Sequence, residues 1–435
     1  MPTRPAQFAA SWMLTQEARG LLTRLARVKP FALSEAMVPA AAISTQAQIA
    51  VERYLIAGRR ELRSRVLNYL QWLQGPAGRQ ATPELVQRRF TFLRLRFNTI
   101  LSQFDLFADV ITQRSEHDTG VWLSGLDAVA ADALHLPGGY FESPPLICYL
   151  DRGTGAAIRR ARTRLPGGGE NPVAIVRVPR ERMVGSGIAS SLIHEVGHQG
   201  AALLDLVASL RPVLRGMQAN AGSERIAWRL WERWISEILS DFWSVARVGI
   251  ASTLGLIGVV SLPRVFVFRL SLDDPHPIPW IRVKLSCAIG QALYPHPQWA
   301  RLAELWESFY PLEGMDGEKR QIFRILEAAM PGFVALLVNH RPRALRGKSL
   351  GEVMETEQRQ PARLSGYWRS WRGSPAQMGK ASPSLAFAVI GQAKSDGQIT
   401  PEEESSLLAS LLTHWALQST LATHANYVTS PALAA

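Results

Sequence analysis

The feature that most constrains the fold is the segment SSLIHEVGHQGAALL, in which two histidines lie four residues apart. On an α-helix, His194 and His198 would share one face, one turn apart, with their imidazoles aimed at a common point. Glu195 follows the first histidine and would reach a water held by an ion at that point. Apolar residues on both sides predict a largely buried helix. A metal ion is the expected partner for such a group of buried polar side chains.

A second helical segment, WERWISEILSDFWSVARVG, follows further along the chain and supplies carboxylates. Glu237 and Asp241 are four residues apart, so they would share a helix face. A carboxylate in so apolar a helix is costly unless it is paired or bound to a metal. Glu237 would complete a His₂Glu set, the three protein ligands of a catalytic zinc site. Asp241 would accept the ring N–H of a ligand histidine and fix its tautomer.

HEVGH followed by EILSD resembles the gluzincin group of zinc metallopeptidases, whose pattern is HExxH and then ExxxD on a second helix. The resemblance implies that His194, His198 and Glu237 bind Zn²⁺. It further implies that Glu195 is the general base and that Asp241 orients a ligand. The expected activity is therefore hydrolysis of peptide bonds in a peptide or protein substrate by a zinc-dependent endopeptidase.

The resemblance covers roughly residues 140–290. The predicted strand 173–178 resembles the strand before the HExxH helix that holds an extended substrate. The segment DDPHPIPWIR is loosely similar to a His-Pro…Arg segment of the prenyl-protein-type membrane endopeptidases of this group. On that basis His276 and Arg282 are candidate catalytic residues that would donate to the oxyanion. The metzincin pattern is excluded, because position 204, where a third histidine would stand, is leucine.

Two alternatives to an active peptidase stay open. The first is a catalytically inactive zincin-like interaction protein with a structural metal site, which a fourth protein ligand would indicate. The second is a nucleic-acid-binding protein, because RRFTFLRLRF interleaves arginines with aromatic residues. The spacing of that segment favours a helical core stripe flanked by solvated arginines, so a nucleic-acid partner is not expected. The oligomeric state does not follow from the sequence.

Composition adds expectations about location. The chain has 435 residues and a formal net charge of +12, and its two cysteines exclude a disulfide framework. The amino terminus lacks the uninterrupted apolar stretch of a signal peptide, so a cytoplasmic location is expected. The longest apolar run, residues 248–262, is shorter than a bilayer requires, so no transmembrane span is expected.

Periodicity predicts a mainly α protein with a small β-sheet (α+β), in which a zincin-like metallopeptidase core is flanked by helical regions. Strands are expected at 146–150 and 173–178, and Pro331-Gly332 is expected to end a helix. Five segments are predicted in order: an N-terminal helical region (1–118), a zincin-like domain (119–300), a helical extension (301–340), a basic linker or long loop (341–384) and a C-terminal helical pair (385–435).

Overall fold

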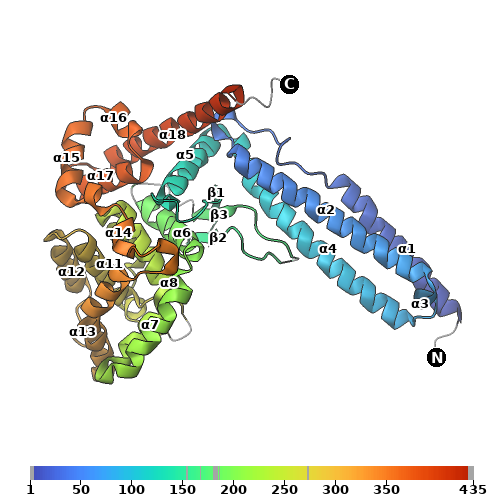
Figure 1. Cartoon of the computed structure of the whole chain (residues 1–435), viewed down its shortest axis with the longest axis horizontal. Helices are drawn as coiled ribbons and strands as arrows, with labels where there is room; N and C mark the ends of the chain where they lie inside the picture. Colours follow the sequence, from blue (N-terminus) through green and yellow to red (C-terminus); the bar gives the residue numbers. More distant parts are fainter. Residues whose placement is uncertain are drawn as a thin grey trace.

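The structure, a computed structural model, describes residues 4–152, 155–166, 168–179, 185, 187–271 and 274–429. It is mainly helical with a three-stranded sheet, as the sequence predicts. A long helical arm projects from a larger helical body, and the sheet lies where the two meet (Figure 1).

The arm is an antiparallel bundle of three long helices. They are α1 (Arg4–Arg27), α2 (Thr45–Gln74) and α4 (Pro83–Thr112), with the short α3 (Pro76–Arg79) at the far end. The Ser44 and Thr82 side chains cap the starts of α2 and α4 by accepting backbone N–H groups. Within RRFTFLRLRF, Phe90, Leu93 and Phe97 are buried. The helical core stripe predicted for this segment is therefore confirmed.

The sheet consists of β1 (Leu146–Asp151), β2 (Ala157–Arg159) and β3 (Ala174–Pro179) in the order β1-β3-β2. β3 pairs with β1 in parallel and with β2 antiparallel. The two predicted strands are confirmed, but the expectation that the 173–178 strand pairs with a substrate is wrong. β3 lies in the centre with a hydrogen-bonded neighbour on each side, and β1 and β2 are the two outer strands of the sheet in the described residues.

The two faces of the sheet belong to different hydrophobic cores. Ile147 and Ile175 pack into the core of the arm, whereas Cys148 and Val176 pack into the core of the body. This division follows from the alternation of side chains along a strand. The sheet therefore joins the arm to the body through side chains on both of its faces.

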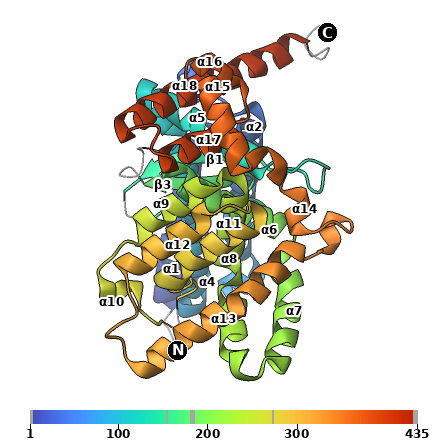
Figure 2. The ribbon, with the colours of Figure 1, turned by 90° about the vertical axis from the view of Figure 1, so that its left-hand side faces the viewer.

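The body is built around α8, which packs against α6, α7, α9, α11, α13 and α17. Figure 2 looks onto the side of the body formed by α9, α11, α12 and α13. The helices of this part are α5 (His117–Leu134), α6 (Gly187–Leu203), α7 (Leu206–Asn220), α8 (Arg225–Val248), α9 (Ile250–Val260), α10 (Arg264–Val267), α11 (Pro279–Leu293), α12 (Gln298–Phe309) and α13 (Gly317–Asn339).

The predicted basic linker at 341–384 is wrong. It contains α14 (Leu350–Val353), α15 (Pro361–Trp371) and α16 (Pro375–Lys380). Leu364 and Trp368 are buried in the body core. The prolines that suggested a loop stand at the first turns of α15 and α16, where a missing N–H costs nothing.

α13 also departs from expectation, because it continues through Pro331 to Asn339. Packing holds the helix beyond the proline, and the Phe333 ring stacks on the Trp231 ring of α8 with centroids 4.9 Å apart. By length and composition alone α13 could cross a membrane, although no transmembrane span was expected from the sequence. This is weak evidence for a span, since 39% of its most apolar window is buried inside the molecule and core helices pass the same test.

The C-terminal helical pair is present as α17 (Pro383–Ser395) and α18 (Pro401–Thr429). α18 lies along α5, so the last described helix packs beside the first helix of the body (Figure 1). One core cluster runs from Leu123 to Trp415 and draws on every predicted segment after residue 118. These segments are therefore parts of one body.

Candidate metal centre

α6 and α8 approach each other closely because two glycines of α6 face α8. A Cβ atom on Gly197 would lie 2.8 Å from Ser240 Cα, and one on Gly200 would lie 2.6 Å from the Trp243 ring. Only glycine permits this spacing of the two backbones. The carboxylate-bearing face of α8 is thereby brought against the histidine-bearing face of α6.

The three predicted metal ligands meet at this contact. One donor atom from each of His194, His198 and Glu237 lies within 4.8 Å of the other two. The Nε2 atom of His194 is 3.2 Å from Glu237 Oε2, and that of His198 is 3.4 Å from Glu237 Oε1. The imidazole rings stand at 89° with centroids 5.0 Å apart. The donors thus surround one point from two helices.

These spacings fit a zinc ion. Tetrahedral zinc with bonds of about 2.1 Å places its ligand atoms about 3.4 Å apart. The imidazole–carboxylate distances of 3.2 and 3.4 Å are close to that value, each to a different oxygen of Glu237, and one ligand atom from each residue lies within 4.8 Å of the other two. Two imidazoles and one carboxylate are also the donor set of many catalytic zinc sites. The residues present therefore suit zinc in both geometry and chemistry.

Asp241 and Arg282 form a charged layer behind the ligands. Asp241 Oδ1 lies 2.8 Å from His194 Nδ1, which leaves Nε2 of that ring for the metal position. The Arg282 guanidinium donates to both Asp241 oxygens, at 2.7 and 2.8 Å. Arg282 thus holds the Asp241 carboxylate, which in turn contacts the His194 ring. This contact suits a role in positioning that ring. The predicted role of Arg282 as an oxyanion donor stays a prediction.

The same contacts set the charges of the cluster. Burial alone would raise the pKa of Glu237, yet the His194 and His198 rings hold the pKa well below its usual range. Burial lowers the pKa of His194, but Asp241 and Glu237 outweigh burial and raise that pKa to about 9. In the metal-free protein a proton on His194, together with the Arg282 guanidinium, therefore balances the two carboxylates. A metal ion would take the place of that proton.

A cavity of about 160 Å³ opens beside the cluster, and Glu195 lines it together with His194 and Asp241. Glu195 is 9% exposed, so its carboxylate is shielded but lies at the cavity. The remaining walls come from Gly155 and Ala156 before β2, from Ser190 and Ser191 of α6, from Ser252, Leu256 and Val259 of α9, and from His276 and Arg282. The candidate base thus shares this cavity with one of the three proposed ligands, His194, whereas His198 and Glu237 do not line it.

His276 reaches the edge of the cluster from the segment before α11. Its Nε2 lies 3.3 Å from Glu237 Oε2, and Asp274 Oδ1 lies 2.8 Å from its Nδ1. It does not belong to the group of three mutually close ligand atoms. His276 therefore lines the cavity, and its role as an oxyanion donor stays a prediction.

Two supporting residues escaped the sequence analysis. Ser236 Oγ lies 3.4 Å from His198 Nδ1, at the position before the third ligand. Asp274 contacts His276. The sequence indicates this contact only through the position of Asp274, two residues before His276 in DDPHPIPWIR.

No protein-family model, curated protein or solved structure matches this chain. The interpretation of the site therefore depends on its own geometry.

Gly197→Ala is expected to destabilise the protein by about 1–3 kcal/mol and to weaken zinc binding, because the added methyl group would push α8 and Glu237 away from the histidines. Thermal unfolding and zinc titration check both effects. Gly216→Ala is the matched control, since Gly216 is exposed on α7 with open space around its Cβ position. Equal stability and zinc affinity in the two variants would contradict the role given to Gly197.

Proposed function

We propose that the chain is a zinc-dependent endopeptidase that hydrolyses peptide bonds through an activated water. The observation that carries this proposal is the convergence of His194, His198 and Glu237 from two helices at zinc-like spacing, with Glu195 on the adjoining cavity. A ligand triad with a carboxylic base on its open side is the arrangement that hydrolytic zinc sites use.

Each residue of the cluster has a chemical task in this proposal. A bound zinc ion supplies Lewis-acid activation of water and of the scissile carbonyl. Glu195 takes the proton of the attacking water and passes it to the leaving amine. Asp241 and Arg282 keep the His194 ring in place with its Nε2 directed at Glu237. The mechanism therefore uses both helices and the segment that carries Arg282.

β2, an outer strand of the sheet, is proposed to align the substrate along its unpaired side in the described structure. Gly155 and Ala156, which precede β2, line the cavity that Glu195 also lines. An extended peptide added to this edge would have its backbone fixed by main-chain hydrogen bonds. This assignment replaces β3, whose two edges are already paired.

The alternative is an inactive zincin-like protein that holds a structural metal, and His276 is the residue that favours it. Its Nε2 is 3.3 Å from a Glu237 oxygen, close enough for a small movement to bring a fourth ligand onto the ion. The side chain is 49% exposed, which leaves it room to move. Four protein ligands would close the site to water.

Metal removal tests the proposal directly. The purified chain is expected to contain one zinc per molecule and to cleave an unfolded protein such as casein. A chelator such as 1,10-phenanthroline should abolish cleavage, and one equivalent of zinc should restore it. Elemental analysis together with a fluorescent casein assay measures both. A zinc-loaded protein that cleaves nothing, but regains cleavage when His276 is changed to alanine, would support the closed site instead.

A further inference from the structure

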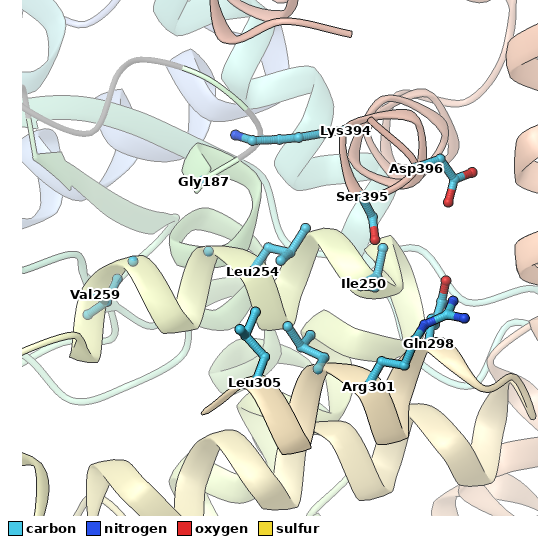
Figure 3. A pocket seen from close by; sticks show the side chains of 13 residues that line it. Gly187, Ile250, Leu254, Val259, Gln298, Arg301, Leu305, Lys394, Ser395 and Asp396 are labelled. Carbon is cyan, nitrogen blue, oxygen red and sulfur yellow. The ribbon is translucent and has the colours of Figure 1, made fainter. Parts of the chain in front are cut away.

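A second and larger cavity, of about 730 Å³, lies on the body next to the metal cleft. Figure 3 looks into it between α9, α12 and the end of α17. Val259 lines both this pocket and the metal cleft, so the two adjoin at the carboxyl end of α9. None of the three proposed zinc ligands lines the pocket. Its volume is within the range typical of small-molecule sites.

The pocket has an apolar part, lined chiefly by Leu254, Val259, Leu302 and Leu305. Leu305 is 46% exposed, so a large apolar side chain faces solvent at this wall. Gly258 widens the space, because no atom lies within 4 Å of the position that its Cβ would take. An apolar chain placed here would bury surface that now contacts water.

The opposite end of the pocket is polar. There the side-chain amides of Gln298 and Gln392 form a hydrogen-bonded chain, the amide relay, that ends on the Asp396 carboxylate. Gln392 Nε2 donates to Asp396 Oδ1 at 3.0 Å and to Gln298 Oε1 at 2.9 Å. A carboxylate oxygen only accepts, so Gln392 must present its nitrogen to Asp396. The Gln298 atom that faces this nitrogen must then be its oxygen. The direction of both amides is therefore determined.

This relay leaves Gln298 Nε2 as an unused donor. Gln298 is 5% exposed, and its Nε2 has no hydrogen-bond partner among the residues that the structure describes. A buried donor without an acceptor costs about 1–3 kcal/mol, so an acceptor brought by a ligand would recover that cost. Gln298 lines the pocket, so a ligand oxygen at this end would give its amide nitrogen the acceptor that it lacks.

Arg301 stands beside that donor. It follows Gln298 by three residues on α12, so the two side chains leave neighbouring positions on one face of the helix, and both line the pocket (Figure 3). Arg301 forms no ion pair with any residue in the described part of the chain. Asp396 is the nearby acid, and its two oxygens already accept from Gln392 and Ser365. A guanidinium next to an amide donor favours a carboxylate.

We propose that this pocket binds a molecule whose apolar chain ends in a carboxylate. The chain lies along Leu254, Leu302 and Leu305, and the carboxylate accepts hydrogen bonds from Arg301 and Gln298. A fatty acid and the carboxyl end of an apolar peptide share this chemistry. Because Val259 separates the pocket from the metal cleft, a bound molecule would lie next to the proposed substrate path.

Calorimetric titration of the full chain tests this with four probes: decanoate, decanol, an apolar pentapeptide with a free carboxyl end, and its C-terminal amide. Decanoate or the free-acid peptide, or both, are expected to bind. The uncharged analogue of each acid that binds, decanol or the peptide amide, should bind about tenfold more weakly. Arg301→Gln should weaken binding of the acid by a similar factor. Gly258→Leu should remove binding, because the new side chain would start from a position whose Cβ meets no atom within 4 Å and would occupy the pocket.

The controls are Arg229→Gln and Gly216→Leu, which alter an exposed arginine of α8 and an open glycine of α7. Both should bind as the wild type does. Binding of decanoate but not of the peptide identifies a fatty-acid site, and the reverse identifies a peptide-end site. Failure of both acids to bind at about 1 mM, or equal binding by Gly258→Leu, would overturn the proposal. The titration needs no zinc, so its outcome is separate from that of the peptidase assay.

Discussion

Glu195→Gln is expected to lower peptide cleavage by at least about 10²–10⁴-fold while zinc stays bound. Glutamine matches glutamate in shape but cannot take a proton from water. The three proposed ligands do not include Glu195, so the metal position should be unchanged. Steady-state cleavage of a fluorescent peptide or casein, measured with zinc content on the same preparation, checks both halves of this expectation.

Glu232→Gln is the matched control for that experiment. Glu232 also lies in the body, on α8, but pairs with Arg215 on α7 and does not line the metal cleft. Its variant should keep full activity. If Glu195→Gln cleaved as fast as the wild type, the general base would have been assigned to the wrong residue.

Glu237→Ala is expected to lose the single bound zinc. Glu237 lies between the two imidazoles and supplies the only carboxylate of the ligand group. Changes to residues behind metal ligands cost roughly 10–100-fold in affinity, and removal of a ligand itself should cost more. Zinc content after dialysis against a weak chelator measures the loss, and cleavage should disappear with the metal.

Because Glu237 is buried, its removal also leaves uncompensated groups around it, so folding must be followed by circular dichroism. Glu237→Gln keeps the side-chain volume and provides a second variant in case alanine prevents folding. Glu232→Ala on the same helix should keep its zinc. Retention of one tightly bound zinc by a folded Glu237 variant would refute the His₂Glu assignment.

The arrangement of the metal cluster could be predicted because it depends on short-range helical geometry. A spacing of four residues places His194 with His198, and Glu237 with Asp241, wherever the helices lie. The approach of the two helices depends on Gly197 and Gly200 fitting against Ser240 and Trp243, a match between distant segments. The sequence offered two reasons for these helices to meet: the cost of burying an unpaired carboxylate, and the resemblance to the HExxH and ExxxD pattern.

Three other features could not be predicted from the sequence: the short strand β2, the role of each proline, and the side chains that support the histidines. β2 has three residues, too few to show an alternating pattern. Proline is ambiguous, since Pro361 and Pro375 start helices and Pro331 lies inside one that its neighbours hold by packing. Ser236 and Asp274 act on histidines through contacts that only the folded chain creates.

The division of the sheet between two cores bears on how the molecule unfolds. Loss of the arm would uncover Ile147 and Ile175, while the opposite side of the same strands stayed packed in the body. The arm therefore contributes to the cooperativity of the whole chain. A shortened protein that lacked it would present an apolar strand surface to solvent and would tend to aggregate.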